Sequence, residues 1–431
     1  MLMLAKKSEM KFQWRSLGYK TKLIILCSIA NFINAADRVL MPIAIISMTR
    51  EYKWNLSIQG WILSAFAFGY FTSQVLCANA GNKYGGKKVL CFAVFLWSVS
   101  TIATPLCASY LPLLIAARVI LGLGEGLGLP TIFQLFAQHI PPEQRSRAFG
   151  YMVAAGSVGQ TIASLFIPHV EWKLSFEIFG SMGLLWVACW LFTYHDPPSQ
   201  TDEEAQLIPS AKNEGESLCI ARLEWISHWC LWAVYIAHFA MNWSNYIIMQ
   251  WLPTYLSRTL GANTGKHEPY CYSLYCQLFL WNWYTIHRYF FYITWSHLAD
   301  QLVTVGWPIL KVRKLMTLLG LAGPGICLVF FPEVSNLLVA VLVISMAMGL
   351  CAANSSGHLS NHADFAPNHA GITFAVSNTL ATIPGILCGP LTAELVTASG
   401  GRWFPVFLLA GTINFTASII YYTQSSTKPI L

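Results

Sequence analysis

Residues 111–137 read LPLLIAARVILGLGEGLGLPTIFQLFA, and Arg118 and Glu125 are their only charged side chains. A helix needs about 20 mostly apolar residues to cross the hydrocarbon core of a bilayer. This stretch is long enough and apolar enough to do so. It therefore predicts a membrane-spanning helix that carries two charges into the membrane, where an isolated charge is costly.

The rest of the chain has the same apolar character. Hydrophobic residues make up 55% of its 431 residues and charged residues only 10%, whereas about 25% of the residues in a soluble domain are charged. A soluble fold could not bury this much apolar surface. We predict twelve membrane-spanning helices, at about 23–46, 58–79, 89–109, 111–137, 148–168, 176–194, 228–252, 272–295, 315–331, 336–355, 371–396 and 403–422.

Lys and Arg gather in alternate loops between these spans. If both ends of the chain are cytoplasmic, 17 of the 26 basic residues fall in inner segments, 6 in outer loops and 3 within spans. An excess of basic residues in cytoplasmic loops is the usual signature of membrane topology. The pattern indicates an even number of spans, and it accounts for the net charge of +7 without a nucleic-acid partner.

The longest polar stretch divides the predicted spans into two sets of six. We therefore predict a cytoplasmic N-terminal segment (1–22), a six-helix half (23–194), a flexible cytoplasmic linker (195–227), a second six-helix half (228–422) and a cytoplasmic tail (423–431). The expected fold is an all-α membrane protein with twelve helices in two halves. We expect it to act as a monomer in the lipid bilayer.

A polar loop with basic residues recurs at equivalent places in the two halves. After the second span it reads ANAGNKYGGKK and contains Asn82, Lys83 and Gly85; after the eighth span, Asp300 is followed by a basic cluster that includes Arg313. The pattern resembles the loop signature of the major facilitator superfamily, in which an acidic residue holds one conformation. The resemblance implies a conformational latch, weaker in the first half because Asn82 replaces the acid. A plain basic inner loop is the alternative.

Further motifs occur in a consistent order along the chain. They are Asp37-Arg38-Val39, Gly60-Trp61-Ile62-Leu63-Ser64, Gly69-Tyr70, Arg118-x3-Gly122-x-Gly124-Glu125-Gly126, Asn242-Trp243, Pro253-Thr254-Tyr255, Asp364-Phe365-Ala366-Pro367, Ser377-Asn378-Thr379 and Ile383-Pro384-Gly385. Together they resemble the anion:cation symporter family (solute carrier family 17), and most closely its plant branch of phosphate transporter 4 or probable anion transporter proteins. The resemblance implies the major facilitator fold and transport by alternating access between two halves.

Arg38 lies about two thirds of the way along the first span, and an ionisable residue at such a depth is a functional candidate. Asn34 precedes it by four residues, so the two side chains share a helix face. Pro42 follows one turn later and would loosen the helix. We expect Arg38 to bind an anion; a structural ion pair with Glu125, or a side chain that reaches the membrane surface, is the alternative.

Arg118, Gly122 and Glu125 form one stripe of the fourth span, because their spacing is i, i+4, i+7. The guanidinium of Arg118 offers a fork of donors that suits phosphate or carboxylate, and a carboxyl group buried in the bundle could exchange a proton. The resemblance links the positions of Arg38, Arg118 and Glu125 to anion binding and coupling, and Tyr70 is a further candidate. The alternative is that Arg118 and Glu125 only pair within the bundle.

Two features depart from the family pattern. Residues 264–293 are crowded with aromatics, and a reading one nucleotide later is codon-compatible with the family's eighth span. Our hypothesis is a local frameshift, which transcript sequencing would test, so Arg288 in this stretch is not a site candidate. Met241 stands just before Asn242, where the family often has a basic residue.

Several other kinds of site find little support. The glycines at every second position from Gly122 do not complete a dinucleotide-binding pattern, and close helix packing explains them better. No CxxC pair accompanies a histidine and no nucleophile–base pair stands out, so we expect no metal, no cofactor and no enzyme activity. Cys271 and Cys276 could pair on an outer loop, although nothing else indicates a disulfide framework. His358 and His362 are candidates for a polar lining or for pH sensing.

The expected function is secondary active transport of inorganic phosphate or a related small anion, coupled to H+ or Na+. An organic anion such as ascorbate or a carboxylate is the close alternative, and a non-transporting membrane receptor on the same fold is a different class. The resemblance also implies a multi-pass protein of a plastid (chloroplast) membrane. The Golgi or another endomembrane is the alternative location.

Overall fold

The computed structural model describes residues 18–76, 84–140, 142–193, 228–259, 291, 294–365 and 370–428. Its α-helices are α2 (Tyr19–Tyr52), α3 (Leu56–Leu76), α5 (Gly86–Cys107), α6 (Leu111–His139), α7 (Pro142–Phe166), α8 (Trp172–Thr193), α10 (Trp229–Thr259), α12 (Ile309–Phe330), α13 (Leu337–Cys351), α14 (His358–Phe365), α15 (Ala370–Leu380), α16 (Ile383–Ala398) and α17 (Phe404–Gln424). Residues 294–304 are helical as well.

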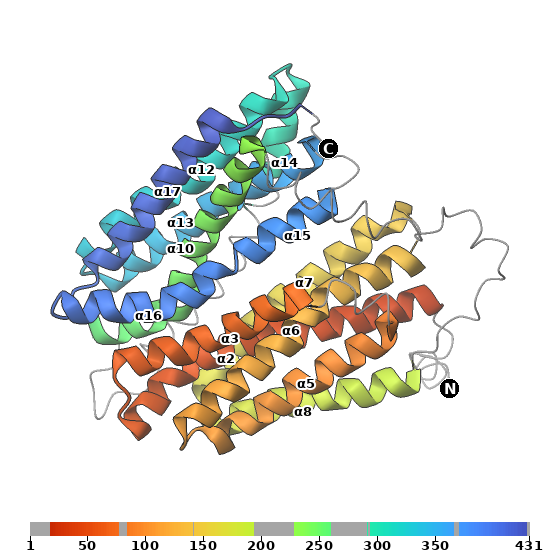
Figure 1. Cartoon of the computed structure of the whole chain (residues 1–431), viewed down its shortest axis with the longest axis vertical. Coiled ribbons are helices and arrows are strands. Elements are labelled where there is room, and N and C mark those ends of the chain that lie inside the picture. Colours follow the sequence, from red (N-terminus) through yellow and green to blue (C-terminus); the bar gives the residue numbers. More distant parts are fainter. Residues whose placement is uncertain are drawn as a thin grey trace, which may run out of the picture.

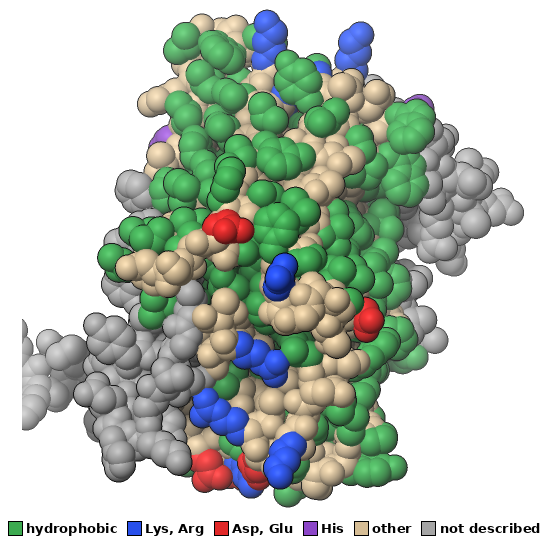
Figure 2. Space-filling view, turned by 90° about the vertical axis from the view of Figure 1, so that its left-hand side faces the viewer, with side chains coloured by type: hydrophobic (Ala, Val, Ile, Leu, Met, Phe, Trp, Pro, Cys, Tyr) green, Lys and Arg blue, Asp and Glu red, His purple; other side chains and the backbone are tan. Residues whose placement is uncertain are grey.

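The helices form two bundles that follow the order of the chain. In Figure 1, α2 to α8 make up one bundle and α10 to α17 the other. In the described part of the chain, nine helices are long and apolar enough to cross a membrane. Large hydrophobic side chains are exposed on many of them. Hydrophobic side chains also cover much of the face seen in Figure 2, where the charged side chains lie mostly in the lower half and at the top edge. This is the surface of a multi-pass membrane protein.

Eleven of the twelve predicted spans coincide with helices of the described residues. The exception is the predicted span 272–295, which lies almost entirely outside the described residues, as do the linker and the cysteine pair Cys271 and Cys276. α2 (Tyr19–Tyr52) is longer at both ends than the first predicted span, 23–46, and like that span it runs through Pro42. A proline removes one backbone donor from a helix but does not always end it.

The eleventh predicted span is divided into two helices. α15 ends at Leu380 and α16 begins at Ile383. Pro384 lies in the first turn of α16, where its missing N–H costs nothing, and the residue before a proline is disfavoured in a helix. The Ile383-Pro384 pair therefore explains why the span is broken at this place.

The glycines of α6 serve helix packing, as predicted. A Cβ at Gly122 would collide with the backbone of Phe66 in α3, whereas one at Gly124 would approach the backbone of Trp97 in α5 to 2.9 Å. Alternate glycines thus face different neighbours: Gly122 and Gly126 face α3, and Gly124 and Gly128 face α5. The close packing brings the charged side chains of α6 beside those of neighbouring helices.

The two bundles meet most closely where α3 lies against α16. A Cβ on Gly60 of α3 or on Gly389 of α16 would collide with the backbone of the other residue. Further along α3, the hydroxyl of Thr379 donates to Oε1 of Gln74 at 3.4 Å. In Figure 1 the bundles lie together at the end where α16 meets α3, and they diverge toward α14 and α7.

Candidate functional site

An ion pair joins α2 and α6 in the middle of the first bundle. Nε of Arg38 donates to Oε2 of Glu125 at 2.8 Å. Glu125 is completely buried, but 24% of the Arg38 side chain is exposed although the residue lies in the middle of a membrane-spanning helix. The structural pair considered as an alternative from the sequence is thus present in this conformation, and Arg38 also borders open space.

Two aromatic rings of α3 cover the guanidinium of Arg38, and a tyrosine of the second bundle interacts with it. Its Cζ lies 4.9 Å from the ring centroid of Tyr70 and 5.7 Å from that of Phe66, both in α3. Tyr246 of α10 interacts electrostatically with Arg38 from the second bundle. Gly385 of α16 makes room for this tyrosine, because a Cβ there would lie 2.7 Å from the Tyr246 ring. Arg38 therefore lies where the two halves face each other.

Arg118 lies deeper in the same bundle. Only 3% of its surface is exposed, and its Cζ lies 5.8 Å from the ring centroid of Phe66. Its charge interacts with two carboxyl groups, those of Glu125 and Asp37. Nε and Nη1 of Arg118 have no hydrogen-bond partner among the described residues.

Asp37 is a further member of the site, with no role predicted from the sequence. It is buried, and its Oδ2 accepts a hydrogen bond from Oγ1 of Thr101 in α5 at 3.4 Å. Its place beside Arg38 in an apolar span was the signal that could have identified it. With Asp37, the site holds two guanidinium groups and two carboxyl groups, so it is formally neutral when all four are ionised.

The structure brings the predicted binding and coupling residues together. Asn34 is buried and faces Glu125, and Tyr70 covers the guanidinium of Arg38. Oε1 of Glu125, Oδ1 of Asp37 and Nη2 of Arg38 have no hydrogen-bond partner among the described residues. Leaving a buried polar group unpaired costs about 1–3 kcal/mol, so the site holds donors and acceptors that a ligand or another conformation could satisfy.

The predicted latch residues occupy different environments. Asn82 and Lys83 lie outside the described residues, and Gly85 adopts a positive φ of 83° just before α5. Asp300 is exposed. Arg313 instead pairs with Asp364 of α14, with Nε to Oδ2 at 2.7 Å and Nη2 to Oδ1 at 3.2 Å.

The pairing of Arg313 with Asp364 was not expected from the sequence. Arg313 also donates through Nη1 to the carbonyl of Ser356 at 2.8 Å, so it joins the start of α12 to both ends of α14. Asp364 belongs to a motif that we quoted only for the family resemblance. Of the two acidic residues Asp300 and Asp364, it is Asp364 that pairs with Arg313.

Three buried histidines connect helices of the second bundle. Nδ1 of His238 in α10 lies 2.7 Å from Oγ of Ser377 in α15, and Nδ1 of His362 in α14 lies 3.2 Å from Oγ1 of Thr373 in α15. The ring of His358 lies 5.8 Å from that of His238. His238 and His362 thus attach α15, the inner part of the broken span, to α10 and α14.

Comparison with known proteins identifies the family to which this chain belongs. Residues 27–387 match the Major Facilitator Superfamily. The chain is 32% identical to the chloroplastic ascorbate transporter of Arabidopsis thaliana (97% of this chain, 77% of that protein). It is 30% identical to the chloroplastic sodium-dependent phosphate transport protein 1 of the same plant (97% and 81%), and 31% identical to human sialin (86% and 76%).

Solved structures share the fold at low sequence identity. The crystal structure of a bacterial homologue of the human lysosomal transporter Spinster, inward-facing and unoccupied, has a TM-score of 0.76 at 16% identity and covers 96% of this chain and 98% of its own. The inward-open xylose transporter XylE of E. coli has a TM-score of 0.71 at 13% identity (95% and 97%). With its ordered motifs, its fold and its relatives, this chain belongs to the Major Facilitator Superfamily and, within it, to the anion:cation symporter family.

Proposed function

We propose that this chain moves inorganic phosphate or a related small anion across a membrane by alternating access, with a proton as the coupling ion. The observation that carries the proposal is the ion pair of Arg38 and Glu125, in which the carboxylate is buried and the guanidinium is partly exposed. Arg38 can therefore meet an anion from the space between the halves while Glu125 stays out of its reach.

The charge balance of the site supports coupling to a proton. With Asp37 and Glu125 ionised, the two carboxylates offset the charges of Arg38 and Arg118, and an anion would have to compete for the guanidinium groups. Protonation of Glu125 would weaken its pairing with Nε of Arg38 and leave the site with a net positive charge. Proton and anion binding would then favour each other, and linkage makes that effect reciprocal.

Sodium fits the same place less well. The carboxylate of Glu125 already has a guanidinium nitrogen at 2.8 Å, and Arg118 lies close enough to interact with it as well. A second cation beside these groups would be repelled, and in an environment of low dielectric constant that repulsion is strong. A proton neutralises the carboxyl without adding a cation of its own.

The neutral surroundings in the second bundle favour a small anion. α10 places Asn242, Asn245 and Tyr246 at partly exposed positions, and Met241 is buried where the family often has a basic residue. The forked guanidinium of Arg38 suits phosphate. An organic anion remains the second candidate, because relatives over most of the chain include a protein named as an ascorbate transporter.

The coupling role is tested with purified chain in liposomes that are preloaded with phosphate. Glu125→Gln keeps the shape of the side chain but cannot change its charge. We expect this variant to exchange labelled phosphate across the membrane as the parent does, while its uptake no longer responds to an imposed pH gradient. Glu177→Gln, which changes an exposed glutamate of α8, serves as the matched control and should keep the response.

Two outcomes would contradict the coupling proposal. A Glu125→Gln variant that still accumulates phosphate when the pH gradient is imposed would exclude Glu125 as the proton carrier. Parent chain that responds only to a sodium gradient, imposed without a pH gradient, would show sodium to be the coupling ion. Both gradients are therefore applied separately to the same preparation.

The choice of substrate is tested in the same liposomes with a panel of anions. Phosphate should be taken up faster than ascorbate, sialate or a dicarboxylate at equal concentration. A preference for ascorbate would support the organic-anion alternative. Binding of phosphate without uptake of any member of the panel would indicate a receptor on this fold.

We further propose a plastid membrane as the location and the monomer as the working unit. The plant relatives quoted above carry the description chloroplastic. A fluorescent fusion of the full-length transcript should label the plastid envelope or an inner plastid membrane, and label in the Golgi would contradict this. Light scattering of the purified chain in detergent should give the mass of one chain.

The loop residues remain part of the proposal as a conformational latch. Arg313 holds both ends of α14 through Asp364 and Ser356, and Gly85 supplies the turn before α5. If Asp364 is the working partner, Asp364→Asn should slow transport more than Asp300→Asn does. Equal effects of the two changes would argue against this assignment.

A further inference from the structure

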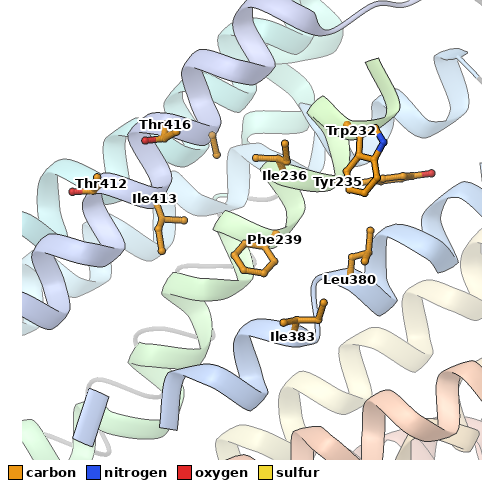
Figure 3. Close-up of a pocket in the computed structure, with 10 residues that line it drawn as sticks. Trp232, Tyr235, Ile236, Phe239, Leu380, Ile383, Thr412, Ile413 and Thr416 are labelled. Carbon is orange, nitrogen blue, oxygen red and sulfur yellow. The ribbon is translucent and has the colours of Figure 1, made fainter. Parts of the chain in front are cut away.

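A groove on the second bundle is bordered by three helices. Its floor is α10, one wall is formed by the ends of α15 and α16, and the other wall is α17; we call it groove C. It is lined by Trp232, Tyr235, Ile236, Phe239, Leu380, Ile383, Thr412, Ile413, Thr416 and Ala417, and its volume is about 480 Å³. Figure 3 shows Phe239, Leu380 and Ile413, from the three sides, around the same space.

The first bundle has a groove at the equivalent place, which we call groove N. It is lined by Thr21, Ile24, Ile25, Ser28, Ile29, Phe32, Tyr151, Ala155 and Met182, and its volume is about 670 Å³. Its floor is α2 and its walls are α7 and α8. The first, fifth and sixth predicted spans of a half therefore build each groove, so the two halves repeat the same feature in unrelated residues.

Both grooves open to the surface that faces the membrane. Beyond groove C, the wall of α16 continues in the exposed residues Leu387 and Leu391. Beyond groove N, the wall of α7 continues in the exposed residues Val158 and Ile162. Hydrocarbon is the medium that surrounds such stripes in a membrane protein, so lipid chains are what meets the open side of each groove.

The chemistry of groove C suits an acyl chain and not a polar group. None of the described residues that line it is charged. The hydroxyl of Thr412 already donates to the carbonyl of Leu408 in its own helix at 2.9 Å, so it needs no further hydrogen-bond acceptor. An apolar chain would thus bury its surface against this wall without leaving the hydroxyl of Thr412 unpaired.

The length of groove C fits within one leaflet. From Trp232 to Phe239 the helix rises by roughly 10 Å, and one leaflet contributes about half of a hydrocarbon core about 30 Å thick. Trp229, at the start of α10, is exposed, and tryptophan favours the level of the lipid headgroups. This places the groove just below the headgroups of the predicted inner leaflet.

We propose that grooves C and N each bind one acyl chain of an inner-leaflet lipid. In groove C the chain lies against Leu380 and Ile383, the residues that flank the break between α15 and α16. Movement of α15 relative to α17 would change the width of the groove. The bound chain therefore favours the conformation in which the groove is open.

The test uses the full chain in liposomes that contain a phospholipid with a photoreactive group midway along one acyl chain. After illumination, mass spectrometry locates the labelled residues. We expect label on both grooves to exceed label on the exposed stripe residues Leu387 and Val158 several-fold. Label that is spread evenly over the exposed stripes would overturn the proposal, because it would indicate ordinary surrounding lipid.

The second measurement compares the photolabel of groove C before and after a substitution that fills the groove. Thr416→Trp places a large side chain on the open wall of groove C and should lower its label several-fold while groove N keeps its label, which also shows that the variant is folded. Thr423→Trp is the matched control, since Thr423 is exposed on α17 one heptad further along and is not part of the groove. Undiminished label of groove C in Thr416→Trp would overturn the assignment to this groove. If that variant fails to fold, Leu380→Trp fills the opposite wall and is judged by the same label.

Discussion

Arg38 and Arg118 carry the same charge in different surroundings. Arg38 is partly exposed between aromatic rings and already uses one donor for Glu125, whereas Arg118 is buried and leaves Nε and Nη1 without hydrogen-bond partners among the described residues. We therefore propose that Arg38 makes the direct contact with an anion between the halves. We propose that Arg118, which is buried, contributes a fixed positive charge behind it.

The contact role of Arg38 predicts a specific kinetic change. In Arg38→Lys the charge is kept, but the planar fork that can hold two oxygens is lost. A hydrogen bond to a charged group contributes about 1.5–3 kcal/mol, so KM for phosphate should rise by roughly tenfold or more, at 1.4 kcal/mol per tenfold. Uptake kinetics in liposomes measure this. Arg50→Lys, at the exposed end of the same helix, should leave KM unchanged, and an unchanged KM in Arg38→Lys would exclude the contact.

The supporting role of Arg118 predicts a change in stability that a second substitution restores. Arg118→Gln leaves Asp37 and Glu125 with one guanidinium between them, and removing one partner of buried charges costs about 3–5 kcal/mol. Thermal unfolding of the purified chain in detergent should show this loss. Adding Glu125→Gln removes the excess negative charge, so the double variant should be more stable than Arg118→Gln alone. If the two losses simply add, Arg118 and Glu125 are not coupled.

At the scale of the element, α15 is a short helix attached mainly by side chains. The hydrogen bonds of Ser377 with His238 and of Thr373 with His362 join it to α10 and α14, and the break after Leu380 separates it from α16. A helix of this length gains little from its own backbone hydrogen bonds. Its position therefore depends on these contacts.

Removing one attachment should loosen α15 selectively. Ser377→Ala leaves Nδ1 of His238 without its partner in a buried place, and we expect faster deuterium exchange of residues 373–380 than in the parent chain. Ser418→Ala is the control, because the hydroxyl of this buried serine bonds to Phe415 in its own helix. Equal exchange in the two variants would mean that packing, and not the hydrogen bond, holds α15.

Most of the helices and several residues of the candidate site could be predicted from the sequence. Apolar runs predicted the spans, and ionisable residues within those runs identified Arg38, Arg118 and Glu125 as candidates. Helical periodicity fixes which side chains share a helix face. The pairing of Arg313 with Asp364 could not be predicted, since it depends on how α12 and α14 lie against each other. Tyr246 was missed for a similar reason: it reaches Arg38 from the other bundle.

At the scale of the whole molecule, the contact of α3 with α16 joins the two halves near their predicted outer ends. Gly60 and Gly389 let the two backbones meet, and such close packing tolerates no added atoms without movement. Alternating access requires the halves to separate at one end when they close at the other. The pair of glycines is therefore a contact that the transport cycle must make and break.

A side chain at this contact should keep the outer end from closing. In Gly389→Val the added atoms meet the backbone of Gly60, so the conformation described above is disfavoured and the opposite one is populated. A cysteine at the buried Ser64, which lies beside Gly389, should then react faster with a membrane-impermeant maleimide added from outside, while phosphate uptake falls.

Gly150→Val in α7 is the control, because a Cβ at Gly150 meets nothing within 4 Å, and it should change neither the rate of labelling nor phosphate uptake. Slower labelling in Gly389→Val would mean that the glycine contact does not close the outer end, and the assignment of inner and outer sides from the basic loops would have to be reversed.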